Sequence, residues 1–155
     1  MLATSKGFTL IELLIVLAII GVLSALLMAN FVGIRQRARD GQRKADLRQI
    51  QAALELYRAD TGSYPDTASF PSCPQSFVNG TTTTYMKSIP CDPLTSQSYE
   101  YKGNAATGTY CLRACLENTN DAQVAEGKGN GSASCNAQLT DCSTSGYANF
   151  TVENP

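Results

Sequence analysis

One carboxylate interrupts a long apolar segment near the N-terminus of this 155-residue sequence. Between Phe8 and Ala29, 22 residues carry a single charge, on Glu12. A charged side chain in such a segment costs about 2.5 to 3.5 kcal/mol on membrane-insertion scales and usually has a partner. The nearest cation, Lys6, is neither an i,i+3 nor an i,i+4 neighbour, and no residue inside the segment can pair with Glu12. We therefore expect the partner to come from another molecule.

Six cysteines form a second set of reactive side chains, and all lie beyond the apolar segment. They are Cys73, Cys91, Cys111, Cys115, Cys135 and Cys142. An even number confined to one part of a chain is typical of disulfides in an oxidising compartment. A zinc site is the alternative, but it favours C-x2-C pairs or histidines, and this chain has C-x3-C and no histidine. The sequence therefore favours disulfides.

The pairing of these cysteines stays open, because six cysteines can combine in many ways. Our first hypothesis pairs Cys135 with Cys142, since both lie in one turn-rich loop near the end of the chain. Our second pairs Cys73 with Cys91.

The other polar residues give little support for catalysis. Without histidine the chain lacks a histidine base or metal ligand, and no nucleophilic serine elbow occurs. The glycines around Lys128 do not form a phosphate-binding P-loop, because Ala122 stands where glycine is needed and Gly129 where Ser or Thr is needed. We expect no enzymatic activity and no cofactor other than a structural calcium ion.

A single long helix must position these residues. Apolar residues recur at helical spacing after the apolar segment: Leu47, Ile50, Leu54 and Tyr57. A similar spacing precedes them: Ile34, Ala38, Gly41 and Ala45. With no proline between Phe8 and Asp60, we predict one helix from about Phe8 to about Ala59, ended by Gly62 and Pro65. Its first 22 residues would span about 33 Å at ~1.5 Å per residue, enough to cross a bilayer core of roughly 30 Å.

Short strands are expected after the helix. Ser98–Lys102, Thr109–Glu117 and Tyr147–Val152 contain β-branched or aromatic residues and are bounded by turn-forming residues. Three or four antiparallel strands laid over the amphipathic half of the helix would bury its apolar stripe. The predicted fold class is α+β, a long N-terminal helix packed on a small antiparallel sheet.

The N-terminal residues also resemble a known processing signal. The run Lys6-Gly7-Phe8-Thr9-Leu10-Ile11-Glu12 is similar to the class III signal of type IV pilins and type II secretion pseudopilins. The resemblance implies that a prepilin peptidase cleaves between Gly7 and Phe8 and methylates the new amine of Phe8. It also implies that Glu12 pairs with the Phe8 amine of a neighbouring subunit and sets the register of the filament.

Two later runs also resemble the major pseudopilins and favour that branch: the helix ending from Tyr57 to Pro65, and Tyr85–Pro93 followed by Tyr99–Tyr101. The resemblance divides the chain into a leader (1–7), a transmembrane and filament-core helix (8–30), its amphipathic half (31–60) and a disulfide-stabilised head (61–155). It implies a structural subunit of a type IV pilus or type II secretion pseudopilus. The expected partners are other copies of the chain, related pilin subunits, the prepilin peptidase, an inner-membrane assembly platform and, before assembly, membrane lipid.

A calcium site is a weaker implication of the same resemblance, because the C-terminal loop of pseudopilins binds calcium. The candidate oxygen ligands here are Glu117, Asn118, Asn120, Asp121 and Glu126. Their spacing matches no EF-hand loop.

Charge is distributed unevenly along the chain. From Arg35 to Arg48 there are six basic and two acidic residues, a net +4, whereas Thr61–Pro155 has four basic and eight acidic residues, a net −4. We expect this basic neck and acidic head to attract each other between subunits. The positive-inside rule would place the part beyond the apolar segment in the cytoplasm. The cysteines and the signal favour the opposite topology, an inner-membrane protein with its N-terminus in the cytoplasm and its head outside, then in a periplasmic pseudopilus or surface pilus.

Two other functions fit parts of the sequence. One is a competence or adhesion minor pilin, and the other is a monomeric membrane-anchored extracytoplasmic domain that binds a ligand through the loops of its head. DNA binding needs an exposed basic patch, which the acidic head does not offer, so we expect no nucleic-acid partner.

Overall fold

One helix, α1 (Leu10–Thr61), runs through both compact units of the chain, Met1–Arg35 and Gln36–Pro155. The computed structural model describes residues 7–80, 83–121, 139, 142 and 146–153. The predicted long helix is confirmed, with each end displaced by two residues from the prediction. Helix α1 ends where Gly62 takes a left-handed conformation (φ +84°) and its N–H donates to the carbonyl oxygen of Arg58 at 2.8 Å. Glycine favours this cap because it has no Cβ.

The first unit is an apolar helix segment with an uncovered surface. Leu10–Met28 has a mean hydropathy of 2.9 and is, among the described residues, the one segment long and apolar enough to cross a membrane. The large apolar side chains of this unit range from 48% exposed at Val16 to 85% exposed at Phe8. An apolar surface of this size needs lipid or another protein chain to cover it.

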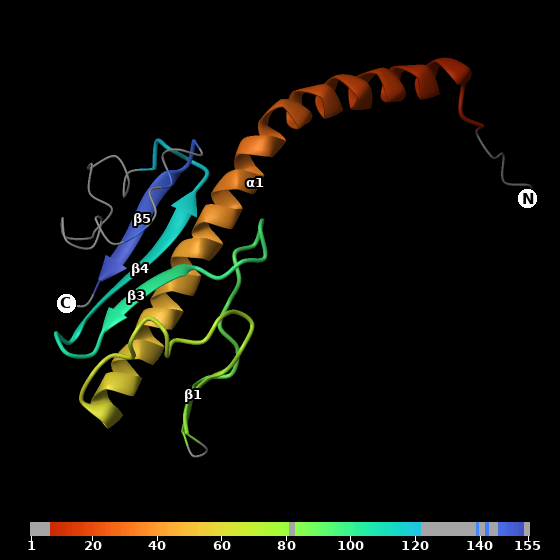
Figure 1. Ribbon diagram of the computed structural model, residues 1–155. Coiled ribbons are helices and arrows are strands. Elements are labelled where there is room, and N and C mark those ends of the chain that lie inside the picture. Colours follow the sequence, from red (N-terminus) through yellow and green to blue (C-terminus); the bar gives the residue numbers. More distant parts are fainter. Residues whose placement is uncertain (1–6, 81–82, 122–138, 140–141, 143–145, 154–155) are drawn as a thin grey trace, which may run out of the picture. The chain divides into compact units, whose positions relative to one another are not determined.

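The second unit contains the later turns of α1 and the head, whose two antiparallel sheets lie beside them (Figure 1). One is a hairpin of β1 (Phe77–Asn79) and β2 (Thr83–Met86). The other contains β3 (Glu100–Asn104), β4 (Thr109–Leu116) and β5 (Ala148–Glu153), with β4 in the centre. The three strands of this larger sheet were predicted, whereas the hairpin was not.

The core lies between α1 and the inner face of the three-stranded sheet. The predicted helix stripe is confirmed, since Leu47, Ile50 and Leu54 are at most 1% exposed and Tyr57 packs against the same cluster. Alternate residues of β4 meet this stripe: Tyr110, Leu112, Ala114 and Leu116. The other predicted stripe, Ile34, Ala38, Gly41 and Ala45, is exposed. Among the side chains of α1 that the structure describes, the buried apolar ones therefore lie along its later turns.

Aromatic rings hold the small hairpin onto the helix. Tyr57 of α1 stacks on Phe77 of β1, with ring centroids 5.1 Å apart, and meets Tyr85 of β2 edge-on at 5.4 Å. Phe70 stacks on Tyr101 of β3 at 4.2 Å and also meets Phe77. Such pairs stabilise by about 0.5–1.5 kcal/mol beyond their buried area. Tyr57 thus joins the hairpin to α1, and Phe70 connects the hairpin to the larger sheet.

Candidate assembly site

Gly7 and Phe8, the residues of the predicted cleavage site, lie in non-helical backbone ahead of α1. Both are exposed. A peptide bond with this placement is accessible to a peptidase, because no helical hydrogen bonds need to be broken to reach it. Cleavage there would leave the amine of Phe8 two residues before the helix begins.

Glu12 has a local partner that the sequence analysis overlooked. One oxygen, Oε2, accepts hydrogen bonds from the backbone N–H of Thr9 at 2.9 Å and from the Thr9 hydroxyl at 2.7 Å. The backbone N–H of Glu12 donates to Thr9 Oγ1 at 3.4 Å. The two residues form a capping box, and the signal was present as Thr-x-x-Glu at the start of the apolar run. The prediction that nothing within the segment can pair with Glu12 is therefore wrong for hydrogen bonds, while its ionic partner stays a prediction.

A buried arginine organises the earlier turns of α1 in the head. Arg43 is 2% exposed. Its Nε and Nη2 donate to the two oxygens of Asp92 at 2.7 and 3.2 Å, and its Nη1 donates to Asp40 and Glu117, both at 2.8 Å. Arg39 donates to Glu117 through Nε at 2.6 Å and through Nη2. We call these five residues the Arg43 cluster.

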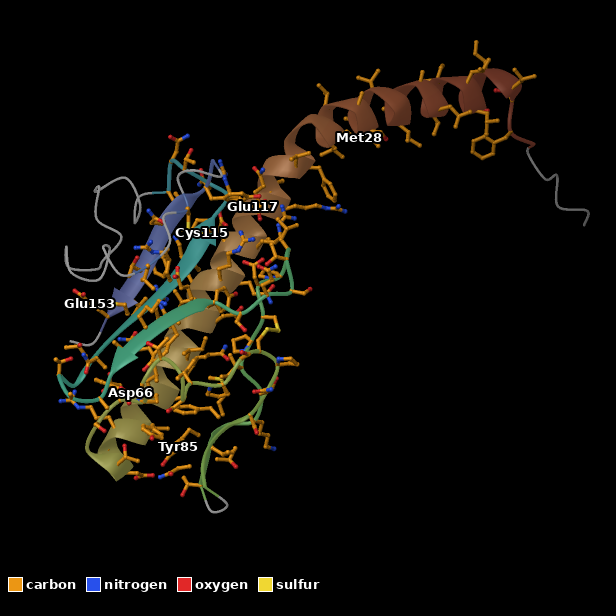
Figure 2. All side chains as sticks on the ribbon, viewed as in Figure 1. Met28, Asp66, Tyr85, Cys115, Glu117 and Glu153 are labelled. Atoms are coloured by element: carbon orange, nitrogen blue, oxygen red, sulfur yellow. A yellow bond between two sulfur atoms is a disulfide. The ribbon has the colours of Figure 1, made fainter. Side chains whose placement is uncertain are left out.

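Backbone groups complete the Arg43 cluster. The two oxygens of Asp40 accept from the backbone N–H groups of Glu117 at 2.9 Å and Asn118 at 2.8 Å. Asp92 Oδ1 also accepts from the N–H groups of Leu94 and Thr95 at 2.8 and 3.0 Å. Figure 2 shows Glu117 just beyond the end of β4, beside α1. The cluster therefore joins α1 to two separate segments, the loop at Asp92 and the end of β4.

The bonds within the Arg43 cluster stabilise its charged forms. Hydrogen bonds from Arg39, with those from Arg43, hold the pKa of Glu117 below its usual range despite burial. Burial alone would raise the pKa of Asp92, but the bonds from Arg43 and two backbone N–H groups outweigh it and lower that pKa. The neighbouring Asp46 differs, because burial raises its pKa although the hydroxyl of Tyr99 donates to it at 2.7 Å.

The basic neck and the acidic head pair within one chain. Besides Arg39 and Arg43, Lys44 forms an ion pair with Asp121 at 2.6 Å. Within one chain the fold brings these charges together, because β4 runs beside α1 and its end places Glu117 and Asp121 near the neck. Attraction between subunits stays a prediction.

The same contacts occupy the calcium candidates. Glu117 bonds two arginines, Asp121 bonds a lysine, and Asn118 Oδ1 accepts from the N–H of Asn120 at 3.2 Å. Glu126 lies outside the described residues. No group of three metal-ligating His, Cys, Asp or Glu side chains occurs in the part of the chain that the structure describes. The described carboxylates face cations, and we derive no calcium site from them.

Disulfides secure the two segments that the Arg43 cluster reaches. Cys73 bonds Cys91 with a Cα–Cα distance of 5.3 Å, so this predicted pair is confirmed. Cys115 bonds Cys142 at 5.6 Å, which shows that the predicted Cys135–Cys142 pair is wrong. Cys111 is also disulfide-bonded, and Cys135 lies outside the described residues.

The sheet register gives the reason for the Cys115–Cys142 pair. Cys115 of β4 lies opposite Asn149 of β5, and the side chain of Asn149 accepts a hydrogen bond from the backbone N–H of Cys142 at 2.9 Å. This contact brings Cys142 to Cys115. The register joins residues far apart in the chain, so it could not be seen from the spacing of the cysteines.

Comparisons with known proteins show which family the chain resembles. Residues 2–28 match the model of the prokaryotic N-terminal methylation motif, and residues 30–128 match the model described as type II secretion system (T2SS), protein G. The chain is 34% identical over 102 residues to the type II secretion system core protein G of Escherichia coli, covering 60% of this chain and 70% of that protein. The corresponding protein of Pseudomonas aeruginosa is 31% identical over 114 residues, covering 69% and 80%.

A pilus component is also similar. The type IV wide pilus major component PilA4 of Thermus thermophilus is 48% identical over 60 residues, covering 39% of this chain and 46% of that protein. No solved structure matches the chain significantly.

Proposed function

Because the chain belongs to the family of type II secretion system protein G, we propose that it is a structural subunit of a filament, a secretion pseudopilus or a type IV pilus. One observation carries this proposal. Leu10–Met28 is long and apolar enough to span a membrane, its surface is uncovered in the single chain, and it precedes a disulfide-bonded head. A bundle of such helices would cover this surface and leave the heads outside. A structural role of this kind needs no catalytic group.

Processing by a prepilin peptidase would prepare the subunit for assembly. The match of residues 2–28 to the N-terminal methylation motif supports cleavage between Gly7 and Phe8 and methylation of the new amine. The free α-amino group has an unperturbed pKa of about 7.7–8.0, so it is largely cationic at neutral pH, and methylation keeps that charge. The product therefore carries a cation where the unprocessed chain has a neutral peptide bond.

Glu12 would set the register between subunits through that cation. Among the residues that the structure describes, its carboxylate is bonded by Thr9 alone, and these neutral donors supply no counter-ion. The Phe8 amine of a neighbouring copy would supply the counter-ion inside an apolar bundle. A misplaced neighbour would leave two unpaired charges in that bundle, which costs several kcal/mol for each ion.

The head would lie outside the cytoplasm and the N-terminus inside it. The disulfides support this topology, because disulfides persist in the periplasm and on the cell surface and are rare in the cytosol. Membrane lipid would surround the apolar helix before assembly, and an inner-membrane platform would move subunits from lipid into the filament together with related pilins. The pilus remains a second candidate because the Thermus pilus component is 48% identical over 60 residues.

The proposal is tested by following processed subunits into filaments. Wild-type chain and the variants Glu12→Gln and Glu55→Gln would be expressed in the native host, and sheared surface filaments, periplasmic filaments and membranes would be analysed by mass spectrometry. Glu55→Gln is the matched control, because Glu55 lies in the later turns of α1, beyond the apolar segment, and a glutamine can still accept the bond from Tyr64. We expect all three chains to begin at methylated Phe8, but only wild type and Glu55→Gln to enter filaments.

Two outcomes contradict the proposal. A wild-type chain that still begins at Met1 would refute processing at Gly7. Filaments of Glu12→Gln at the wild-type level would refute the role of Glu12 in register. The branch is then decided by the fraction that contains the wild-type filaments: a pilus is sheared from the cell surface, whereas a pseudopilus stays in the periplasm.

A further inference from the structure

Two cysteines lie on the same face of the central strand β4. Cys111 and Cys115 are four residues apart, and side chains alternate between the two faces of a strand, so both point away from α1. Cys115 is bonded to Cys142 of the segment before β5, and Cys111 is also disulfide-bonded. The outer face of β4 is therefore covalently linked to chain that follows it, and Cys111 and Leu139 pack together there.

The Cys115–Cys142 bond does not join consecutive cysteines of the chain. In chain order the cysteines fall into three close pairs, and Cys115 follows Cys111 directly, whereas Cys135 stands between Cys115 and Cys142. Closing a loop becomes less probable roughly as the 3/2 power of its length. With separations of 4 and 27 residues, Cys115 in an unfolded chain meets Cys111 more often than Cys142.

A Cys111–Cys115 bond is incompatible with the folded head. Four residues of extended strand separate Cα atoms by about 13 Å at ~3.3 Å per residue, and a disulfide needs less than about 7 Å. Strand β4 cannot bend to meet this limit, because it pairs with β3 along one edge and β5 along the other. It also carries the buried Tyr110, Leu112 and Leu116. The bond favoured in the unfolded chain thus blocks the central strand.

We propose that the head matures by disulfide exchange and that this chain is a substrate of a thiol–disulfide isomerase. An isomerase thiolate attacks Cys111–Cys115 at the sulfur of Cys111, forms a mixed disulfide with it and releases Cys115 as a thiolate. This thiolate attacks Cys142 in a Cys135–Cys142 bond, forms the observed Cys115–Cys142 bond and releases the Cys135 thiolate. The Cys135 thiolate then attacks the mixed disulfide at Cys111 and releases the isomerase thiolate. Two disulfides and one thiolate are present before and after, so no net oxidant or reductant is consumed.

The exchange rests on the proposed export of the head to an oxidising compartment, but it is tested without export. The purified full chain would be reduced and denatured, then diluted into nonionic detergent micelles with a dithiol oxidase, either alone or together with protein disulfide isomerase. Free thiols would be alkylated at fixed times and the disulfides mapped by mass spectrometry. The matched variant carries Cys111→Ala and Cys135→Ala, which leaves Cys73–Cys91 and Cys115–Cys142 as pairs of consecutive cysteines.

With the oxidase alone, we expect Cys111–Cys115 to predominate in the wild-type chain. The isomerase should then raise the early yield of Cys115–Cys142 at least fivefold, but should change that yield less than twofold in the matched variant. Equal wild-type yields with and without the isomerase would overturn the proposal. The same dependence on the isomerase in the variant would overturn it too, because competition from Cys111 would not be the cause. Neither result bears on filament assembly, which Glu12→Gln tests separately.

Discussion

Replacing Arg43 with methionine should destabilise the head by about 3–5 kcal/mol at neutral pH, the usual cost of breaking a buried ion pair by removing one partner. Arg43 is 2% exposed and bonds three carboxylates. Without it, Glu117 keeps Arg39, but Asp40 and Asp92 keep only backbone N–H donors. The local charge changes from −1 to −2. Since domains are stable by about 5–15 kcal/mol, the loss would be a large part of the total.

Urea unfolding of the full chain in detergent micelles would measure this loss, followed by the near-ultraviolet circular dichroism of the seven tyrosines. Arg48→Met is the matched control, because Arg48 is an exposed arginine on the same helix and should change stability by no more than about 0.5 kcal/mol. Adding Asp92→Asn to Arg43→Met should recover part of the lost stability, because it removes a carboxylate charge that no longer has its arginine partner. A change below about 1 kcal/mol for Arg43→Met would refute the view that this cluster holds the head on α1.

Three further predictions follow from the structure of the head. The free energy of unfolding should fall as pH decreases below about 4–5, because the folded state lowers the pKa values of Asp92 and Glu117 below their unfolded values of about 3.9 and 4.3. Urea titrations at pH 3–7 would measure this dependence, and Glu117→Gln should flatten it. Gly103→Ala should destabilise the head by about 1–3 kcal/mol, since a Cβ there would collide with the carbonyl oxygen of Pro65. Gly41→Ala, in open space within α1, should stabilise the fold by about 0.5–1 kcal/mol, and thermal melts would show the opposite signs of the two effects. Calcium or a chelator should shift the melting temperature by less than 2 °C, approximately the error of the measurement, because the candidate carboxylates already pair with cations; a larger rise with calcium would contradict the assignment.

The sequence predicted the helix and its apolar stripe because both depend on local periodicity. Leu47, Ile50 and Leu54 recur at helical spacing, and the same spacing places them on one buried face. The strands of the larger sheet were found from their aromatic and β-branched residues. The hairpin was missed because β1 and β2 have only three and four residues, too few to show alternation.

The Arg43 cluster could not be predicted in the same way. Apolar periodicity does not reveal a helix face whose buried residues are charged. In α1 this face contains the buried Asp40, Arg43 and Asp46. The apolar spacing through Ala38 and Ala45 indicated another face, which the structure leaves exposed. Burying Arg43 depends on Asp92 and Glu117, which are 49 and 74 residues further along the chain. The pairing of Cys115 with Cys142 depends on tertiary structure for the same reason.

The placement of the Arg43 cluster has a mechanical consequence. A force that travels along the backbone of α1 from residue 35 enters the head at Arg39 and Arg43, which pass it through ion pairs to Glu117 and Asp92. Both receiving segments are cross-linked nearby, since Asp92 follows Cys91 and Glu117 is two residues beyond Cys115. Tension on the helix is therefore shared between two segments that are each tied to another part of the chain, and neither disulfide-closed loop can be extended to its full length while its disulfide is intact.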